Sequence, residues 1–88
     1  MRTDALVKLA ESANSRDDFV RFLKALSSDF EKSGSEWGNN NLHDFLDGLF
    51  AWAEGCPQYY RNMKLPVDAD RPQWRVFADM LLAARVYE

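Results

Sequence analysis

The chain contains one cysteine and one histidine, Cys56 and His43, the only side chains that could form a thiolate–imidazole catalytic pair. Both lie near the ends of a helix predicted over residues 41–55. Thirteen positions separate them, which corresponds to ~20 Å along a helix, whereas a nucleophile and its base approach to about 3 Å. We therefore expect no catalytic residues, and we interpret Cys56, between Gly55 and Pro57, as a small residue at a helix end.

His43, Asp47 and Glu54 form a second candidate, because they share one face of the same predicted helix. His43 and Asp47 are four residues apart and could both contact a metal ion. Glu54 lies ~16 Å further along the axis from His43, too far to complete a ligand shell with bonds near 2 Å. We expect no metal and no cofactor. The line is interpreted as a solvated acidic face that could also contact a partner.

The excess negative charge is confined to one segment. The 88 residues include 14 Asp and Glu against 11 Lys and Arg, a net charge of −3. Residues 34–56 contain no Lys or Arg, and their four acids are Glu36, Asp44, Asp47 and Glu54. Nucleic-acid binding requires clustered Lys and Arg that contact phosphate. We therefore expect no nucleic-acid partner, and the acidic segment favours a basic protein partner.

Aromatic residues add two further candidates for partner binding. In "QYYRN", Tyr59 and Tyr60 stand beside Arg61 in a predicted connector, and Tyr and Arg are common in binding hot spots. The competing interpretation is that one Tyr covers the end of the core and its hydroxyl caps a backbone group. Trp37 either folds back over the core, which we favour, or marks a contact patch. The predicted partner-binding residues are Trp37, His43, Asp47, Glu54, Tyr59, Tyr60 and Arg61.

The spacing of apolar residues, with few β-branched ones, predicts an all-α protein. We expect a single domain over residues 1–88, a compact bundle of about four helices with an extra turn near 57–63. Residues 1–14 form an N-terminal helix that could be peripheral, and 15–88 form the core. The predicted helices run from 3 to about 13, from 15 to near "KSGS" at 32–35, and over 41–55, and the last begins at Pro72. Ser15 and Asn41 are the predicted N-caps, and Gly55 and Pro57 end the third helix.

The apolar arcs predict which helices are buried. On the third helix this arc covers about 160°, so we expect that helix to be central. The last helix has a wider arc and should be the most buried, with Arg75 and Asp79 paired on a narrow exposed face. Arg85 falls within that arc and is expected to extend outward at the helix end.

Signatures of catalysis and of membrane insertion are absent from the sequence. There is no glycine-rich phosphate loop and no GxSxG, HExxH, CxxC or EF-hand motif, so we expect a protein that is not an enzyme. The N-terminal residues lack the apolar run of a signal peptide. No stretch approaches the roughly 20 apolar residues that span a bilayer, and the single cysteine cannot form an internal disulfide. We expect a cytoplasmic protein with no membrane partner.

Four segments together resemble a known family: "SRDDFVRFLKAL", "EWGNNNLHDFLDGLFAWAEG", "YYRN" and "PQWRVFADMLLAARVYE". They are similar to an uncharacterised family of small bacterial helical proteins, a domain of unknown function, over about residues 15–88. The resemblance implies a helical, bacterial, cytoplasmic protein. It brings no activity, ligand or catalytic residue.

The sequence favours a non-enzymatic protein–protein interaction module with an acidic helix face. One version is an immunity-like or antitoxin-like protein that blocks a basic partner. The alternative is a small-molecule-binding or regulatory helical domain with a pocket near Trp37, Tyr60 and Trp74. Oligomeric state stays open, because a wide apolar arc can face a second copy as well as a neighbouring helix.

Overall fold

The structure is a computed structural model that describes the backbone of residues 2–87 and the side chains of residues 5–87. Its elements are α1 (Arg2–Glu11), α2 (Arg16–Ser33), the 3₁₀ helix η1 (Gly34–Glu36), α3 (Leu42–Asn62) and α4 (Trp74–Ala84). No strand occurs between residues 2 and 87. The predicted all-α bundle of four helices is confirmed. None of the described helices combines the length and apolarity needed to cross a membrane.

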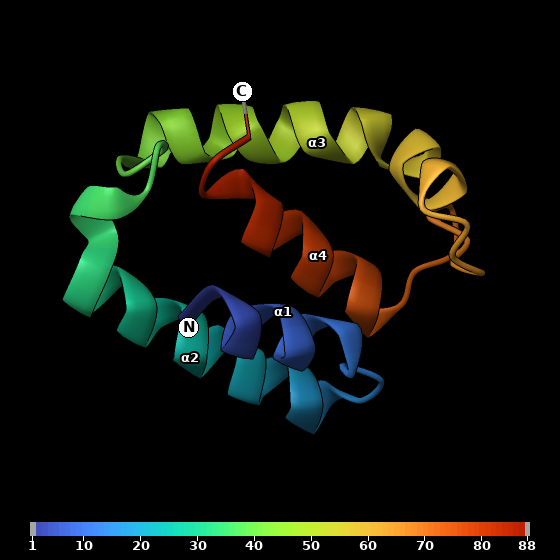
Figure 1. Cartoon of the computed structure of the whole chain (residues 1–88), viewed down its shortest axis with the longest axis horizontal. Helices are drawn as coiled ribbons and strands as arrows, with labels where there is room; N and C mark the ends of the chain where they lie inside the picture. The colour runs from blue at the N-terminus through green and yellow to red at the C-terminus, as the bar shows by residue number, and fades with distance from the viewer. Residues whose placement is uncertain (1, 88) are drawn as a thin grey trace.

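The central element is α4. It lies between α3 and the pair formed by α1 and α2 (Figure 1), and its backbone approaches all three of these helices. Ala78 belongs to a buried cluster with residues of α1 and α2, whereas Val76 belongs to a second cluster with residues of α3. Phe77 is the only residue of α4 with an exposed side chain. The expectation that the last helix is the most buried is confirmed.

The expectation that the third helix is central is wrong. Of the described helices, only α4 approaches the backbone of α3. A single neighbouring helix covers the face that carries Trp52, Cys56 and Tyr60, which are all buried. Within the same apolar arc of about 160°, Leu42, Leu46 and Phe50 remain exposed.

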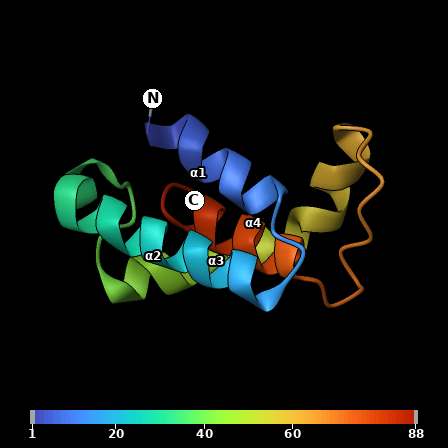
Figure 2. The same cartoon turned by 90° about the horizontal axis from the view of Figure 1, so that it is seen from below.

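The third helix also continues beyond its predicted end. It passes through Gly55 and Pro57, so the extra turn expected near residues 57–63 is the last part of α3. Pro57 lacks the N–H that would bond the carbonyl four residues earlier, and the golden end of α3 bends away from its first half (Figures 1 and 2). Cys56 and Tyr60, on either side of Pro57, are buried in one cluster, and this packing offsets the lost hydrogen bond. Cys56 is thus a core residue and not a helix-end residue.

Both predicted N-caps are confirmed. The Ser15 hydroxyl accepts a hydrogen bond from the backbone N–H of Asp18 at 3.1 Å. The side-chain oxygen of Asn41 accepts one from the backbone N–H of Asp44 at 2.9 Å. These bonds satisfy amide groups that have no partner within the first helical turn.

The first and last helices differ slightly from their predicted spans. α1 ends at Glu11 instead of Ala13, and α4 begins at Trp74 instead of Pro72. The backbone of Gln73 is extended, with φ −150° and ψ 150°. Pro72 therefore belongs to the irregular connection that precedes α4.

Candidate functional site on the outer face of helix α3

Three large apolar side chains are exposed on α3. Leu42, Leu46 and Phe50 follow one another at intervals of four residues, and their exposed fractions are 73%, 50% and 68%. At about 100° per residue they fall within an arc of about 80° on the helix surface. We call these three residues the α3 stripe. Single exposed apolar side chains are ordinary, but a contiguous row is typical of a contact surface.

Acidic side chains run directly beside the α3 stripe. His43, Asp47 and Glu54 lie a further 20–60° around the helix, by the same helical geometry of about 100° per residue, and all three are exposed. His43 Nε2 lies 3.5 Å from Asp47 Oδ2. We call these three residues the acidic strip. Residues 34–56 contain no Lys or Arg, so no Lys or Arg of this segment neutralises the carboxylates of Asp47 and Glu54.

One end of the acidic strip brings together three potential metal ligands. His43, Asp44 and Asp47 each offer an atom, and these atoms lie within 4.8 Å of one another. The third potential ligand beside His43 and Asp47 is thus Asp44 and not Glu54. However, the Asn41 side chain donates to Asp44 Oδ2 at 2.9 Å, and a carboxylate in the first helical turn is stabilised by the helix dipole. Helix capping therefore accounts for the position of Asp44, and all three side chains are exposed.

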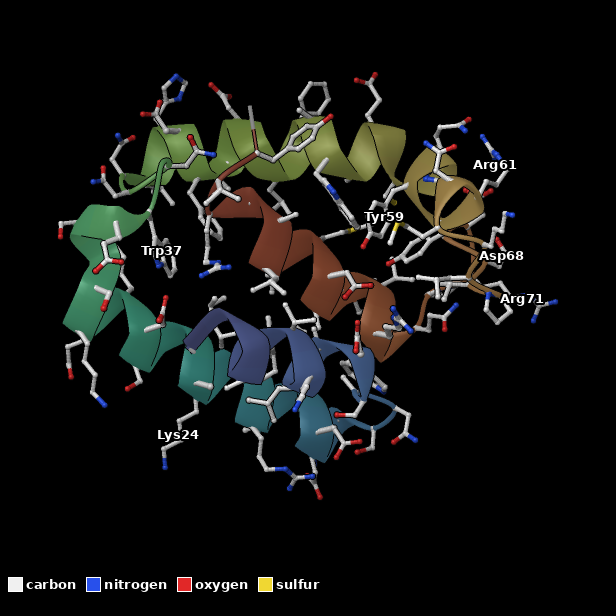
Figure 3. All side chains as sticks on the ribbon, viewed as in Figure 1. Lys24, Trp37, Tyr59, Arg61, Asp68 and Arg71 are labelled. Carbon is white, nitrogen blue, oxygen red and sulfur yellow. The ribbon has the colours of Figure 1, made fainter. Side chains whose placement is uncertain are left out.

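Trp37 folds back over the core, as favoured from the sequence. Its indole N–H donates to Asp29 Oδ2 at 2.8 Å. Its ring meets Phe30 edge to face, with centroids 5.0 Å apart, and stacks with Phe45 at 6.0 Å. The guanidinium carbon of Arg85 lies 5.8 Å from the centroid of the same ring. Figure 3 shows Trp37 in the corner between the end of α2 and the start of α3, where these contacts fix its orientation.

Arg85 does not extend outward as expected. Its side chain is 11% exposed and its Nη1 lies 3.4 Å from Oδ2 of Asp29, whose side chain is 8% exposed. Arg85 Nε also donates to the carbonyl oxygen of Leu82 at 3.0 Å. A buried guanidinium is tolerable when a carboxylate and further hydrogen bonds compensate it. The compensating carboxylate comes from α2, far away in the sequence.

A cavity of about 290 Å³ opens beside Trp37. Its lining consists of Phe30, Trp37, Leu42 and Phe45 together with the asparagines at 39–41. Because Leu42 belongs to both the cavity and the α3 stripe, the two form one continuous apolar surface. We call this hollow the Trp37 cavity.

The two neighbouring tyrosines occupy different environments. Tyr60 is 1% exposed, and its hydroxyl donates to Asp79 Oδ2 at 2.5 Å. Burial and the adjacent Asp79 carboxylate raise the pKa of Tyr60 above its ordinary range. Tyr59 is 41% exposed, and Arg61 is exposed and donates to the side-chain oxygen of Gln58 at 2.8 Å. Tyr60 is therefore the tyrosine that covers the core, although its hydroxyl binds a carboxylate and not a backbone group.

Asp79 also binds Arg75, whose Nε donates to Oδ2 at 3.2 Å. The predicted i,i+4 pair is confirmed, but its predicted exposure is wrong, since the two side chains are only 22% and 12% exposed. Burial raises the pKa of Asp79, although the Tyr60 hydroxyl and the Arg75 guanidinium act in the opposite direction. The pair is covered because α4 lies between the other helices.

The three aromatic residues of the small-molecule alternative do not converge. Tyr60 is buried in the cluster between α3 and α4. Trp37 and Trp74 pack against the other cluster, and Trp74 contacts Phe19 with ring centroids 5.3 Å apart. No single pocket is therefore formed by these three side chains.

The predicted partner-binding residues separate into two groups. His43, Asp47 and Glu54 lie on one strip of α3, whereas Tyr59, Tyr60 and Arg61 belong to its last turns. Figure 3 shows Tyr59 and Arg61 at the bent end of the helix. The prediction missed the apolar residues Phe30, Leu42, Leu46 and Phe50. The width of the apolar arc on α3 was the signal for Leu42, Leu46 and Phe50, because this arc is wider than the face that one neighbouring helix covers.

Comparison with known proteins supplies a family match but no activity. Residues 15–88 match the model of DUF7660, described as a family of unknown function. No curated protein and no solved structure matches the chain. The matched segment contains α2, α3 and α4, whereas the whole of α1 precedes it.

Proposed function

Since this chain belongs to DUF7660, a family of unknown function, we propose its function from geometry: it is a non-enzymatic interaction module that binds a protein partner through the outer face of α3. The observation that carries this proposal is the α3 stripe with the acidic strip directly beside it. Burial of exposed apolar side chains supplies affinity. Carboxylates at the edge of such a contact select the partner and accelerate association.

The partner that fits this face is a protein surface with apolar side chains flanked by Lys or Arg. A second copy of the chain fits less well. In a two-fold antiparallel pair of α3 helices, both acidic strips lie on the same side of the seam, because the symmetry places the same residues opposite each other. Asp47 and Glu54 would then face the like charges of the other copy, which is unfavourable.

One form of this function is an immunity-like or antitoxin-like protein that covers a basic surface of its target. Opposite charges would steer the encounter, so that association is fast at low salt. We place this interaction in the cytoplasm of a bacterium. The free, buried thiol of Cys56 suits a reducing compartment of that kind.

The proposal is tested by capture from host cells with a tagged chain and two matched variants. Phe50→Glu puts a charge into the α3 stripe. Val20→Glu makes the same kind of change at an apolar side chain on α2 that is 54% exposed. We expect the partner to be captured by the wild-type chain and by the Val20→Glu variant. The Phe50→Glu variant should fail to capture it. A partner held equally by both variants would contradict the proposal.

The acidic strip is tested separately by association kinetics with the captured partner. Asp47→Lys combined with Glu54→Lys should slow association at low ionic strength. The difference from wild type should shrink as salt rises from about 0.15 M to about 1 M, because the Debye length falls from ~8 Å to ~3 Å. An unchanged association rate at low salt would remove the acidic strip from the binding surface.

A further inference from the structure

The Trp37 cavity lies at one end of the α3 stripe and shares Leu42 with it. We propose that the partner element bound here is an amphipathic α-helix that inserts one large apolar side chain into the Trp37 cavity and aligns Lys or Arg with the acidic strip. This inference rests on the proposed function and specifies the chemistry of the partner. The cavity, the stripe and the charge distribution each support one part of it.

The size and rigidity of the Trp37 cavity suit a single side chain. Its volume of about 290 Å³ lies at the lower limit of the roughly 300–1,000 Å³ found for pockets that hold drug-sized ligands. Its Trp37 wall is already held by the hydrogen bond to Asp29 and by Phe45 on its face. Filling a preformed pocket requires little ordering of the protein. Large anchors in such pockets contribute much of the affinity of an interface.

The α3 stripe indicates a helical partner. A helix offers no unpaired backbone edge, so a partner cannot bind α3 by adding a β-strand and must pack through side chains. Leu42 and Phe50 are eight residues apart, or ~12 Å along the axis. Positions i and i+7 of a partner helix are ~10.5 Å apart. An anchor at i in the cavity therefore places i+3 or i+4 near Leu46 and i+7 near Phe50.

The charges fix which flank of the partner helix is basic. His43, Asp47 and Glu54 border the stripe on one side only. On the other side of the stripe the next residue is Leu49, which is apolar and partly buried. Lys or Arg on one flank of the partner helix would meet these carboxylates. Lys or Arg on its other flank would meet no carboxylate of the acidic strip and would add no affinity. The one-sided position of the acidic strip therefore favours one orientation of the bound helix.

The test uses the full chain labelled with 5-fluorotryptophan and a synthetic helical peptide of about 16 residues, about 24 Å long. The peptide carries Phe at i, Leu at i+4 and i+7, and lysines on one flank. We expect it to shift the ¹⁹F resonance of Trp37, assigned with Trp37→Phe, and to leave that of Trp74 in place. Replacing the Phe anchor by Ala should weaken binding by tenfold or more, since burying a large apolar side chain is worth about 1.5–3 kcal/mol and 1.4 kcal/mol is tenfold.

Two variants of the protein test the position of the bound peptide from the protein side. Phe30→Ala removes a wall of the cavity and should weaken binding of the Phe peptide but not of the Ala peptide. Val20→Glu should bind both peptides as wild type does. Circular dichroism checks that each variant is folded, and the peptide comparison on the wild-type chain stands even if Phe30→Ala unfolds.

Each other result overturns the inference in a distinguishable way. A peptide that binds α3 with Trp37 unmoved and the anchor irrelevant would exclude the cavity, yet leave the proposed function standing. Equal binding of a peptide with glutamates in place of lysines would exclude the charge alignment, and no binding of any peptide would exclude the helical partner. A Trp37 shift that depends on protein concentration alone would place a second copy of the chain in the Trp37 cavity. Failure of the proposed function is seen elsewhere, as a captured partner that Phe50→Glu still retains.

Discussion

Replacing Tyr60 by Phe removes one hydroxyl from the α3–α4 interface and keeps the ring. Tyr60 is 1% exposed, and its hydroxyl donates to Asp79 at 2.5 Å. A hydrogen bond to a charged group contributes about 1.5–3 kcal/mol. We expect Tyr60→Phe to lower the free energy of unfolding by about 2 kcal/mol. For a domain of 60–100 residues this corresponds to a decrease in Tm of about 8–16 °C.

The measurement is urea denaturation followed by circular dichroism, together with a thermal melt. Tyr59→Phe is the matched control, since the adjacent ring is 41% exposed and its hydroxyl has no hydrogen bond to any residue that the structure describes. That control should change the free energy of unfolding by less than about 0.5 kcal/mol. Similar losses for the two variants would contradict the buried position of Tyr60.

A double-mutant cycle tests the partner of the hydroxyl. Asp79→Asn alone also weakens the ion pair with Arg75, so its own effect is not the energy of the Tyr60 contact. The coupling between Tyr60→Phe and Asp79→Asn isolates that contact, and we expect about 0.5–3 kcal/mol for groups that touch. A coupling of zero would refute the hydrogen bond.

Three further predictions follow from buried positions. Gly48→Ala should destabilise the fold by about 1–3 kcal/mol, because a Cβ would lie 2.7 Å from Asn39 Nδ2 and 2.9 Å from two backbone oxygens. Gly55→Ala in the same helix adds a Cβ that meets nothing within 4 Å and should stabilise the fold by about 0.5–1 kcal/mol. Urea denaturation measures both changes. Burial raises the pKa of the Cys56 thiol, so a disulfide reagent such as DTNB should label it only upon unfolding, and rapid labelling of the native chain would contradict this. The pKa of Tyr60 is raised in the folded state, so the unfolded chain loses this proton first; stability is retained below about pH 10 and falls above it by about 1.4 kcal/mol per pH unit. Urea denaturation across this range should show a smaller fall for Tyr60→Phe.

Local features of the fold could be predicted from the sequence. The caps at Ser15 and Asn41 depend on residues three positions away, and the Arg75–Asp79 pair depends on one helical turn. The all-α class follows from composition and spacing. The caps and the ion pair each depend on residues only three or four positions apart, so the sequence alone is enough to predict them.

The misplaced features depend on packing between distant segments. Arg85 turns inward because Asp29 of α2 lies beside it, and nothing near Arg85 in the sequence indicates that carboxylate. The helix continues through Pro57 because its flanking residues are buried against α4, which outweighs the local tendency to stop. A wide apolar arc shows that a surface is apolar but not whether this chain covers it. The sequence therefore predicted the acidic strip of the candidate site but not the exposed α3 stripe beside it.

The central position of α4 also determines when the chain can fold. A ribosome makes α1, α2 and α3 before α4, and α3 approaches no other described helix. Until α4 is released, the buried cluster that contains Trp52 and Cys56 lacks its α4 member Val76, so this part of the core is completed only after α4 has been made. The nascent chain thus passes through an interval in which both the inner and the outer apolar faces of α3 are open. A partner or chaperone that recognises the outer face would meet it first at that stage, before the bundle has closed.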